Sequence, residues 1–351
     1  MRFGFWMPVF GGWLRNVEDE GMSATFDYQR DLAVRAEHAG WDVTLVAELN
    51  LNDIKGPEAD CLEAWTTAAA LAPLTTRLEL MTAVRPNFRL PALVAKEAAT
   101  IDRIANGRFT LNVVSAWWAT ESAMYGGAWV EHDERYARTE EFIAVLKGMW
   151  TRDEYTLDGR YYTIKAARLA PKPVQRPWPT LYAGGESPAA KDLIARECDA
   201  YLMHGDPPEV LAAKVADMRE RRAAHAGLPP LRFGVAAYAI VRPSDAEVKK
   251  ELARITDVRA TARGYASYLD IIKGSHLETP VSLEDYSVSN RGLRTGLVGT
   301  PEQVADRIRE LERVGIDLVL LQCSPQREEM DRFAQEVFPL VGKATPVAAP
   351  R

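Results

Sequence analysis

The chain has 351 residues, of which 47% are hydrophobic and 26% charged, and its formal net charge is −6 at pH 7. This composition is typical of a globular protein with a large core, and the acidic balance argues against a nucleic-acid partner, which requires a basic face. No apolar run reaches the roughly 18 residues that span a membrane. Three widely spaced cysteines suit reduced thiols, so we expect a cytoplasmic protein.

The first half of the chain alternates strand and helix patterns. Apolar stretches predict buried strands at 2–8, 41–47, 78–84 and 108–114. Helical spacing follows within 26–38, 63–71, 91–104 and 134–150. The segment 153–179 interrupts this rhythm, with a hairpin predicted around Asp158-Gly159 and a proline-rich, irregular remainder.

The second half continues the alternation. Strands are predicted at 180–183, 200–203, 233–241 and 317–322, and helices follow nearly all of them. The segment of about 257–296 fits neither period, so we expect a mobile, functional insertion. Eight such units predict an α/β fold, a (β/α)8 TIM barrel formed by one domain over 1–351. An open doubly wound sheet is the alternative, but its Gly-x-Gly-x-x-Gly signature is absent.

A glycine-rich stretch, Gly184-Gly185-Glu186-Ser187, lies between a predicted strand and a helix. Backbone N–H groups at such a helix start can bind an anion such as phosphate. Arg135 and Tyr136, at another predicted helix start, could add a positive charge and a hydroxyl. A plain helix cap explains 184–187 about as well. For the other two residues the alternative is that Arg135 lies on the surface and Tyr136 in the core.

No metal-ligand or hydrolase motif is evident in the sequence. The five histidines show no ligand spacing, and neither His-Glu-x-x-His nor Gly-x-Ser-x-Gly occurs. His204 follows a predicted strand and should face the barrel mouth. We therefore expect no metal, and we expect a cofactor to supply the reactive group.

Several motifs together identify a family resemblance. They are Ala98–Asp102 with Asn106–Arg108, Asn112–Ser115 with Trp117, Glu131–Tyr136, Gly184–Ser187 and Leu297–Pro301. With them the chain resembles the bacterial luciferase-like flavin-dependent monooxygenases over nearly its whole length, and within them the organosulfur group that acts on dimethyl sulfone or alkanesulfonates. The resemblance implies FMN, used as FMNH₂, at the mouth of a barrel, O₂ as co-substrate and a separate NAD(P)H:FMN reductase. It also implies a homodimer or homotetramer.

The resemblance also assigns residues. Around the flavin ring and its ribityl chain it places Glu48, Leu49, Ala83, Asn112 and Glu121, with Asn112 and the backbone near Ala83 positioning oxygen. Around the phosphate it places Arg135, Tyr136, Gly185, Glu186 and Ser187. The substrate pocket would be shaped by Trp117, His204, Tyr238 and Arg294, and Cys61 would be either a hydrogen-bonding residue of the reaction centre or a small core residue. The segment 257–296 would close over the flavin and exclude water.

The substrate side departs from the alkanesulfonate enzymes. Ala236 and Tyr238 stand where those enzymes carry Arg and His, which favours a neutral substrate such as a sulfone. Our interpretation is a two-component FMNH₂-dependent monooxygenase that oxidises a small organosulfur compound, with or without C–S cleavage. The alternatives are a coenzyme F420-dependent dehydrogenase, a pyrimidine-type ring-opening monooxygenase, whose third-strand Thr is here Ala83, and a non-catalytic flavin-binding barrel.

Overall fold

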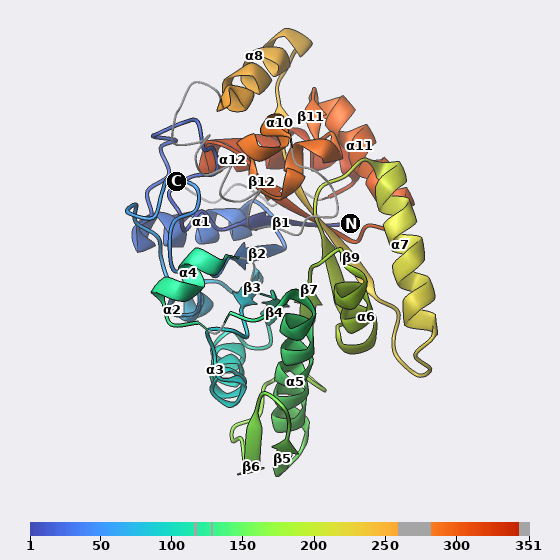
Figure 1. The fold of residues 1–351 in the computed structure, drawn as a ribbon. Helices are drawn as coiled ribbons and strands as arrows, with labels where there is room; N and C mark the ends of the chain where they lie inside the picture. Colours follow the sequence, from blue (N-terminus) through green and yellow to red (C-terminus); the bar gives the residue numbers. More distant parts are fainter. Residues whose placement is uncertain (116–117, 128, 259–281, 344–351) are drawn as a thin grey trace.

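The structure is a computed structural model that describes residues 1–115, 118–127, 129–258 and 282–343. Parallel strands close into a barrel in the order β1-β12-β9-β8-β7-β4-β3-β2 (Figure 1). They are β1 (Arg2–Trp6), β2 (Val43–Val46), β3 (Glu79–Val84), β4 (Phe109–Val113), β7 (Leu181–Ala183), β8 (Ala200–Met203), β9 (Arg232–Tyr238) and β12 (Leu318–Gln322). The predicted TIM barrel is therefore confirmed, and each of the eight predicted strands supplies one strand of the barrel. The predicted strand 233–241 ends earlier, and Ile240–Val241 form a separate strand, β10, paired with β11 (Val298–Gly299).

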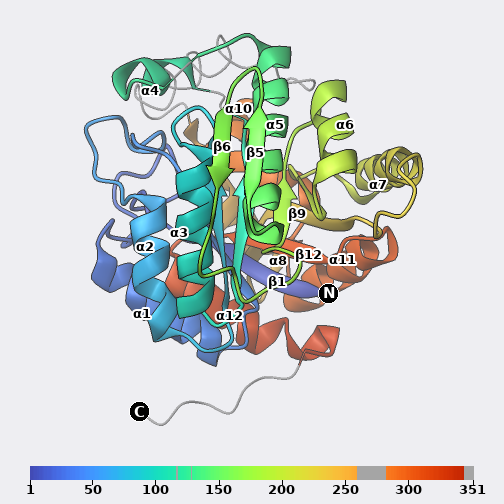
Figure 2. The same ribbon diagram turned by 90° about the horizontal axis from the view of Figure 1, so that it is seen from below.

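Helices surround the barrel (Figures 1 and 2). They include α1 (Phe26–His38), α2 (Ala64–Leu71), α3 (Pro91–Ile104), α5 (His132–Thr151), α6 (Pro188–Glu197), α7 (Pro208–Ala223), α11 (Pro301–Arg313) and α12 (Gln326–Glu336). In α11, Val304, Ile308 and Leu311 are buried at helical spacing, and Thr300 and Gln303 form a capping box at its start. The capping box marks the start of the helix, and the apolar stripe packs inward.

The insertion between β4 and β7 contains the predicted hairpin. Strands β5 (Tyr155–Asp158) and β6 (Thr163–Ala167) pair antiparallel, and Asp158 of the predicted turn is the last residue of β5. Figure 2 shows the hairpin beside α5. A Cβ at Gly148 of α5 would collide with the ring of Tyr155, so this glycine leaves room for the ring. The hairpin therefore lies outside the barrel, next to α5.

Side chains alternate between the interior and the exterior of the barrel, so every second residue of a strand faces inward. An apolar cluster fills the interior: Val43, Leu45, Met81, Tyr182, Ala200, Leu202, Leu318 and Leu320, with Trp6 packed against it. The next inward positions toward the carboxyl ends of the strands are Ala47, Ala83, Asn112, Gly184, His204, Ala236 and Gln322, and all of them line a cavity. Because four of these residues are alanine or glycine, the barrel mouth has room for a ligand.

The second insertion is only partly described. Residues 259–281, most of the predicted mobile segment, lie outside the described residues. The described parts before and after them include α8 (Asp245–Thr256), α10 (Leu283–Ser287) and the 3-10 segment η3 (Ser289–Thr295). In the described part of the chain, no helix is both long and apolar enough to cross a bilayer.

Candidate active site

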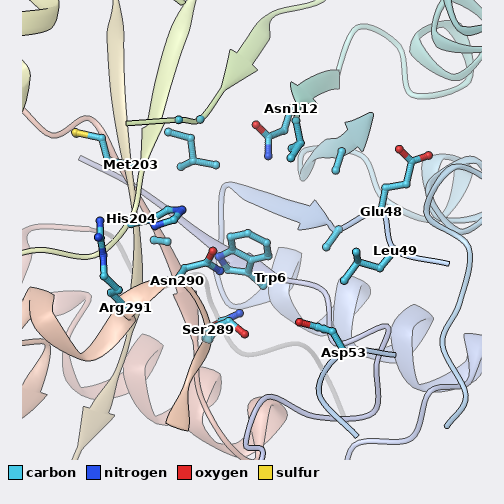
Figure 3. A pocket seen from close by; sticks show the side chains of 18 of the residues that line it. Trp6, Glu48, Leu49, Asp53, Asn112, Met203, His204, Ser289, Asn290 and Arg291 are labelled. Carbon is cyan, nitrogen blue, oxygen red and sulfur yellow. The ribbon is translucent and has the colours of Figure 1, made fainter. Parts of the chain in front are cut away.

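The cavity at the carboxyl ends of the barrel strands has a volume of about 390 Å³. Figure 3 shows Glu48, Leu49 and Asn112 on one side of it and His204 and Arg291 on the other. Its size is within the usual range of small-molecule and cofactor sites, about 300–1,000 Å³. Ligands of TIM barrels bind at this end of the strands, so we take the cavity as the candidate active site.

The segment 184–187, which we call the cradle because a phosphate site is predicted there, lies where β7 meets α6. Gly185 has a φ of +148°, and a Cβ there would lie 2.6 Å from Ala190 Cβ and 3.1 Å from the Tyr136 hydroxyl. Only glycine fits this position, and it lets the backbone of 185–187 approach a ligand closely. Ser187 caps α6 and accepts a hydrogen bond from Ala190 N at 3.3 Å. Arg135 lines the same cavity, so the two predicted halves of the phosphate site come together.

The opposite wall is formed by Asn112 of β4 and by residues that follow β2 and β3. Asn112 is 6% exposed, and its Oδ1 has no hydrogen-bond partner among the described residues. Glu48 accepts a hydrogen bond from Arg85 N at 2.6 Å and forms an ion pair with Arg89. Burial raises the pKa of Glu48, although the charges of Arg89 and Arg85 oppose this shift. The wall therefore offers a fixed carboxyl group and an amide oxygen that is available to a donor.

Arg85, which lines the cavity, forms a buried ion pair with Glu121, which does not line it. Arg85 Nη2 donates to Glu121 Oε1 at 2.7 Å, and the two side chains are 1% and 0% exposed. Glu121 also accepts a hydrogen bond from the backbone N–H of Asn50. The pair thus ties the loop that carries Glu48 and Leu49 to the helix α4 (Ala119–Met124).

A charge network encloses the cavity on the side of β8. Glu186 accepts bonds from Lys214 and Arg291, and Lys214 also contacts Asp206 at 2.7 Å. Burial alone would raise the pKa of Glu186, but the nearby His204 and the hydrogen bonds from Arg291 and Lys214 lower it to about 2. The carboxylate of Glu186 is therefore engaged by two cations, Lys214 and Arg291.

His204 is half-buried in the wall next to this network. Burial lowers its pKa to about 4, against the opposing charge of Glu186. The imidazole is consequently neutral near pH 7, with one nitrogen that donates and one that accepts. Among the described residues, no group of His, Cys, Asp and Glu could hold a metal ion.

Comparison with known proteins identifies the family. The model of luciferase-like monooxygenases matches residues 1–318. This chain belongs to that family. An FMNH₂-dependent dimethylsulfone monooxygenase from Pseudomonas putida is 36% identical over 97% of this chain and 95% of its own, and one from Pseudomonas fluorescens is 37% identical over 97% and 94%.

The fold of this luciferase-like protein also occurs in solved structures. The long-chain alkane monooxygenase LadA superposes with a TM-score of 0.83 at 20% identity, over 97% of this chain and 91% of the other. At this identity the likeness concerns the fold alone.

Most residues expected to hold the flavin line the cavity of the luciferase-like barrel. Those that do are Glu48, Leu49, Ala83, Asn112, Arg135, Tyr136, Gly185, Glu186 and Ser187, together with His204 from the substrate side. Glu121 does not line the cavity; it pairs with Arg85, which does. Its contacts support a positioning role for the loop of Leu49 and Asn50.

Three residues expected on the substrate side also lie outside the cavity lining. The Cys61 Sγ lies 4.0 Å from the carbonyl oxygen of Leu49, and burial raises the pKa of the thiol. Tyr238 is buried, and Gly292 lies against its backbone. Arg294 pairs with Asp285 at 3.1 Å instead. Trp117 lies outside the described residues.

The structure adds cavity residues that the sequence interpretation missed. Trp6 and Gln322 face inward from β1 and β12, and Arg15 pairs with Asp53 at 3.2 Å on the cavity wall. Inward alternation along the first and last strands is the signal that could have identified Trp6 and Gln322. Arg15 and Asp53 lie in loops, and nothing in their local sequence indicates that they meet.

Proposed function

We propose that this protein is an FMNH₂-dependent monooxygenase that oxidises a small, neutral organosulfur compound, with a sulfone as the preferred substrate. The observation that carries the proposal is one continuous cavity that joins the cradle at Gly185 to the wall formed by Ala83 and Asn112. The cavity would hold the phosphate of FMN at the end of the cradle and its flat ring system at the opposite wall. Relatives at 36% and 37% identity are named for this cofactor and for dimethyl sulfone.

The residues present fit FMN. The backbone of 185–187 at the start of α6 would bind the phosphate, because helix N-termini and glycine turns favour anions. Arg135 and Tyr136 would add a charge and a hydroxyl. The Asn112 Oδ1, which lacks a partner among the described residues, would accept a hydrogen bond from the ring, and Ala83 would leave space above it.

The charges of the cavity favour a neutral substrate. Arg135 lines the cavity at the end that we assign to the flavin phosphate. The other arginines of the lining, Arg15, Arg85 and Arg291, are each paired with a carboxylate: Asp53, Glu121 and Glu186, respectively. A sulfonate would have to displace one of these carboxylates or remain without a counter-ion in a partly buried site, which is costly. A sulfone carries no charge and avoids this penalty.

Reduced FMN, when bound, supplies the two electrons that divide O₂ between an inserted oxygen atom and water. The protein's own part is positioning and exclusion of water. Insertion into a C–H bond next to a sulfonyl group gives an α-hydroxy sulfone, which breaks its C–S bond to give a sulfinate and an aldehyde. We also propose a separate NAD(P)H:FMN reductase as the source of FMNH₂, and a homodimeric or homotetrameric assembly.

The test is turnover by the purified protein with a separate NADH:FMN reductase, FMN and dimethyl sulfone in air. We expect formaldehyde release that requires both the protein and the sulfone. A reaction without the protein controls for free reduced flavin, which consumes oxygen by itself, and catalase removes the peroxide formed. Absence of product across a panel of sulfones and sulfonates would refute the proposal. Reduction of coenzyme F420 by an alcohol would indicate the dehydrogenase instead, and FMN binding without any turnover would indicate a non-catalytic barrel.

A further inference from the structure

Two buried donors face the cavity without a partner. Among the described residues, neither Trp6 Nε1 nor Gln322 Nε2 has a hydrogen-bond acceptor. Both residues line the cavity, and Gln322 is 2% exposed. A buried donor without a partner costs stability, on the order of 1–3 kcal/mol, so such a pair indicates a ligand or water that accepts from both.

The backbone holds these donors side by side. β1 and β12 are neighbours in the barrel, and the register that pairs Phe5 with Leu321 brings Trp6 level with Gln322. The Trp6 carbonyl accepts from Gln326 Nε2 at 2.7 Å, and the Gln322 carbonyl accepts from Ala239 N at 3.0 Å. Neighbouring strands lie about 4.8 Å apart, so one small group can reach both side chains. Figure 3 shows the Trp6 indole in the middle of the cavity.

The surroundings select the chemistry of the ligand. Phe10, Leu202 and Ala236 give this part of the cavity apolar walls. His204 is neutral near pH 7, since burial lowers its pKa to about 4. The ligand that suits a donor pair in such a setting has two acceptor oxygens, no donors, no charge and small alkyl groups. A sulfonyl group between two alkyl groups has these properties.

We propose that Trp6 Nε1 and Gln322 Nε2 donate hydrogen bonds to the two sulfonyl oxygens of a neutral sulfone and so determine substrate specificity. This inference rests on the proposed function and deepens it. The donors fix the oxygens on the side of β1 and β12, which leaves an alkyl carbon directed toward the wall of Ala83 and Asn112. They act by positioning and take no part in proton transfer.

The test uses substitutions that remove a donor and retain bulk, Trp6→Phe and Gln322→Leu. Each should raise the KM for dimethyl sulfone roughly three- to tenfold, which is the loss of one neutral hydrogen bond, with kcat within about twofold. The Kd for FMN should stay unchanged. The matched control is Trp41→Phe, because Trp41 Nε1 also lacks a partner among the described residues but packs against Phe333 and Phe338, away from the cavity.

Direct binding separates this inference from the proposed function. Dimethyl sulfone is titrated into each FMN-loaded variant, and the shift of the flavin absorption gives a Kd without turnover. Weaker binding by both variants, with wild-type binding by Trp41→Phe, supports the donor pair even if no product forms. Equal binding and equal KM in all proteins would overturn the donor pair while the monooxygenase stands. If the wild-type protein does not bind dimethyl sulfone, the donor pair is overturned, and the monooxygenase proposal falls only if the whole panel of sulfones and sulfonates gives no product.

Discussion

The buried pair of Arg85 and Glu121 allows a quantitative prediction. Substituting Glu121→Leu removes the main counter-ion of a guanidinium that is 1% exposed. The carboxylate of Glu48 is farther away, 4.0 Å from Arg85 Nε. Breaking one side of a buried ion pair costs about 3–5 kcal/mol. We therefore expect the free energy of unfolding to fall by about this amount.

The assay is thermal and urea unfolding of the protein without flavin. Globular proteins gain about 2.1 cal/mol/K of unfolding entropy per residue, or about 0.7 kcal/mol/K for 351 residues, so the Tm should fall by about 4–7 °C. The double variant Arg85→Met/Glu121→Leu has no unpaired charge. It should be more stable than the sum of its single variants predicts by about 2 kcal/mol or more.

Two results would refute this reasoning. A loss below about 1 kcal/mol for Glu121→Leu would mean that Arg85 finds another partner or reaches water. Strict additivity in the double variant would mean that the two side chains do not stabilise each other. Measuring the Kd for FMN in the same proteins adds a second check, because a loosened loop of Glu48 and Leu49 should weaken flavin binding even after the stability loss is taken into account.

The remaining predictions concern the cradle, the ring wall and pH. Gly185→Ala should raise the Kd for FMN at least tenfold in a fluorescence titration, whereas Gly227→Ala, at φ +84° with nothing within 4 Å, should leave it unchanged. Asn112→Leu should weaken FMN binding roughly three- to tenfold by removing one acceptor. Burial lowers the pKa of His204 from 6.5 to about 4, so the unfolded chain takes up a proton first and stability should fall as pH drops between these values. In His204→Gln this part of the pH dependence of the unfolding free energy should disappear; an unchanged slope would contradict the assignment.

The barrel could be predicted because its strands are short, continuous apolar runs, which are typical of parallel sheets buried on both faces. Phe109–Val113 and Leu318–Gln322 are examples, and both are fully buried. The cradle could also be predicted, since Gly185 and Ser187 carry their local signal in turn and cap chemistry. These features depend on residues that are close in sequence.

The substrate side could not be predicted in the same way. Parity along β9 would turn Tyr238 inward, but the backbone of Gly292 lies against Tyr238 N, and the side chain is buried outside the cavity. Arg294 forms an ion pair with Asp285 and does not line the cavity. Both outcomes depend on the path of η3, where Asn290 and Arg291 adopt positive φ values of 59° and 54°. Only tertiary packing imposes such a conformation on residues other than glycine.

The placement of Trp6 and Gln322 affects how the protein becomes functional during synthesis. β1 is the first barrel strand to be synthesised and β12 is the last, yet they are adjacent in the closed barrel. A nascent chain that lacks its final strand has an open seam at this point, and half of the donor pair does not yet exist. If the donor pair binds the sulfone, binding requires the closed barrel, and a chain that ends before residue 318 lacks both β12 and Gln322 and should not bind it.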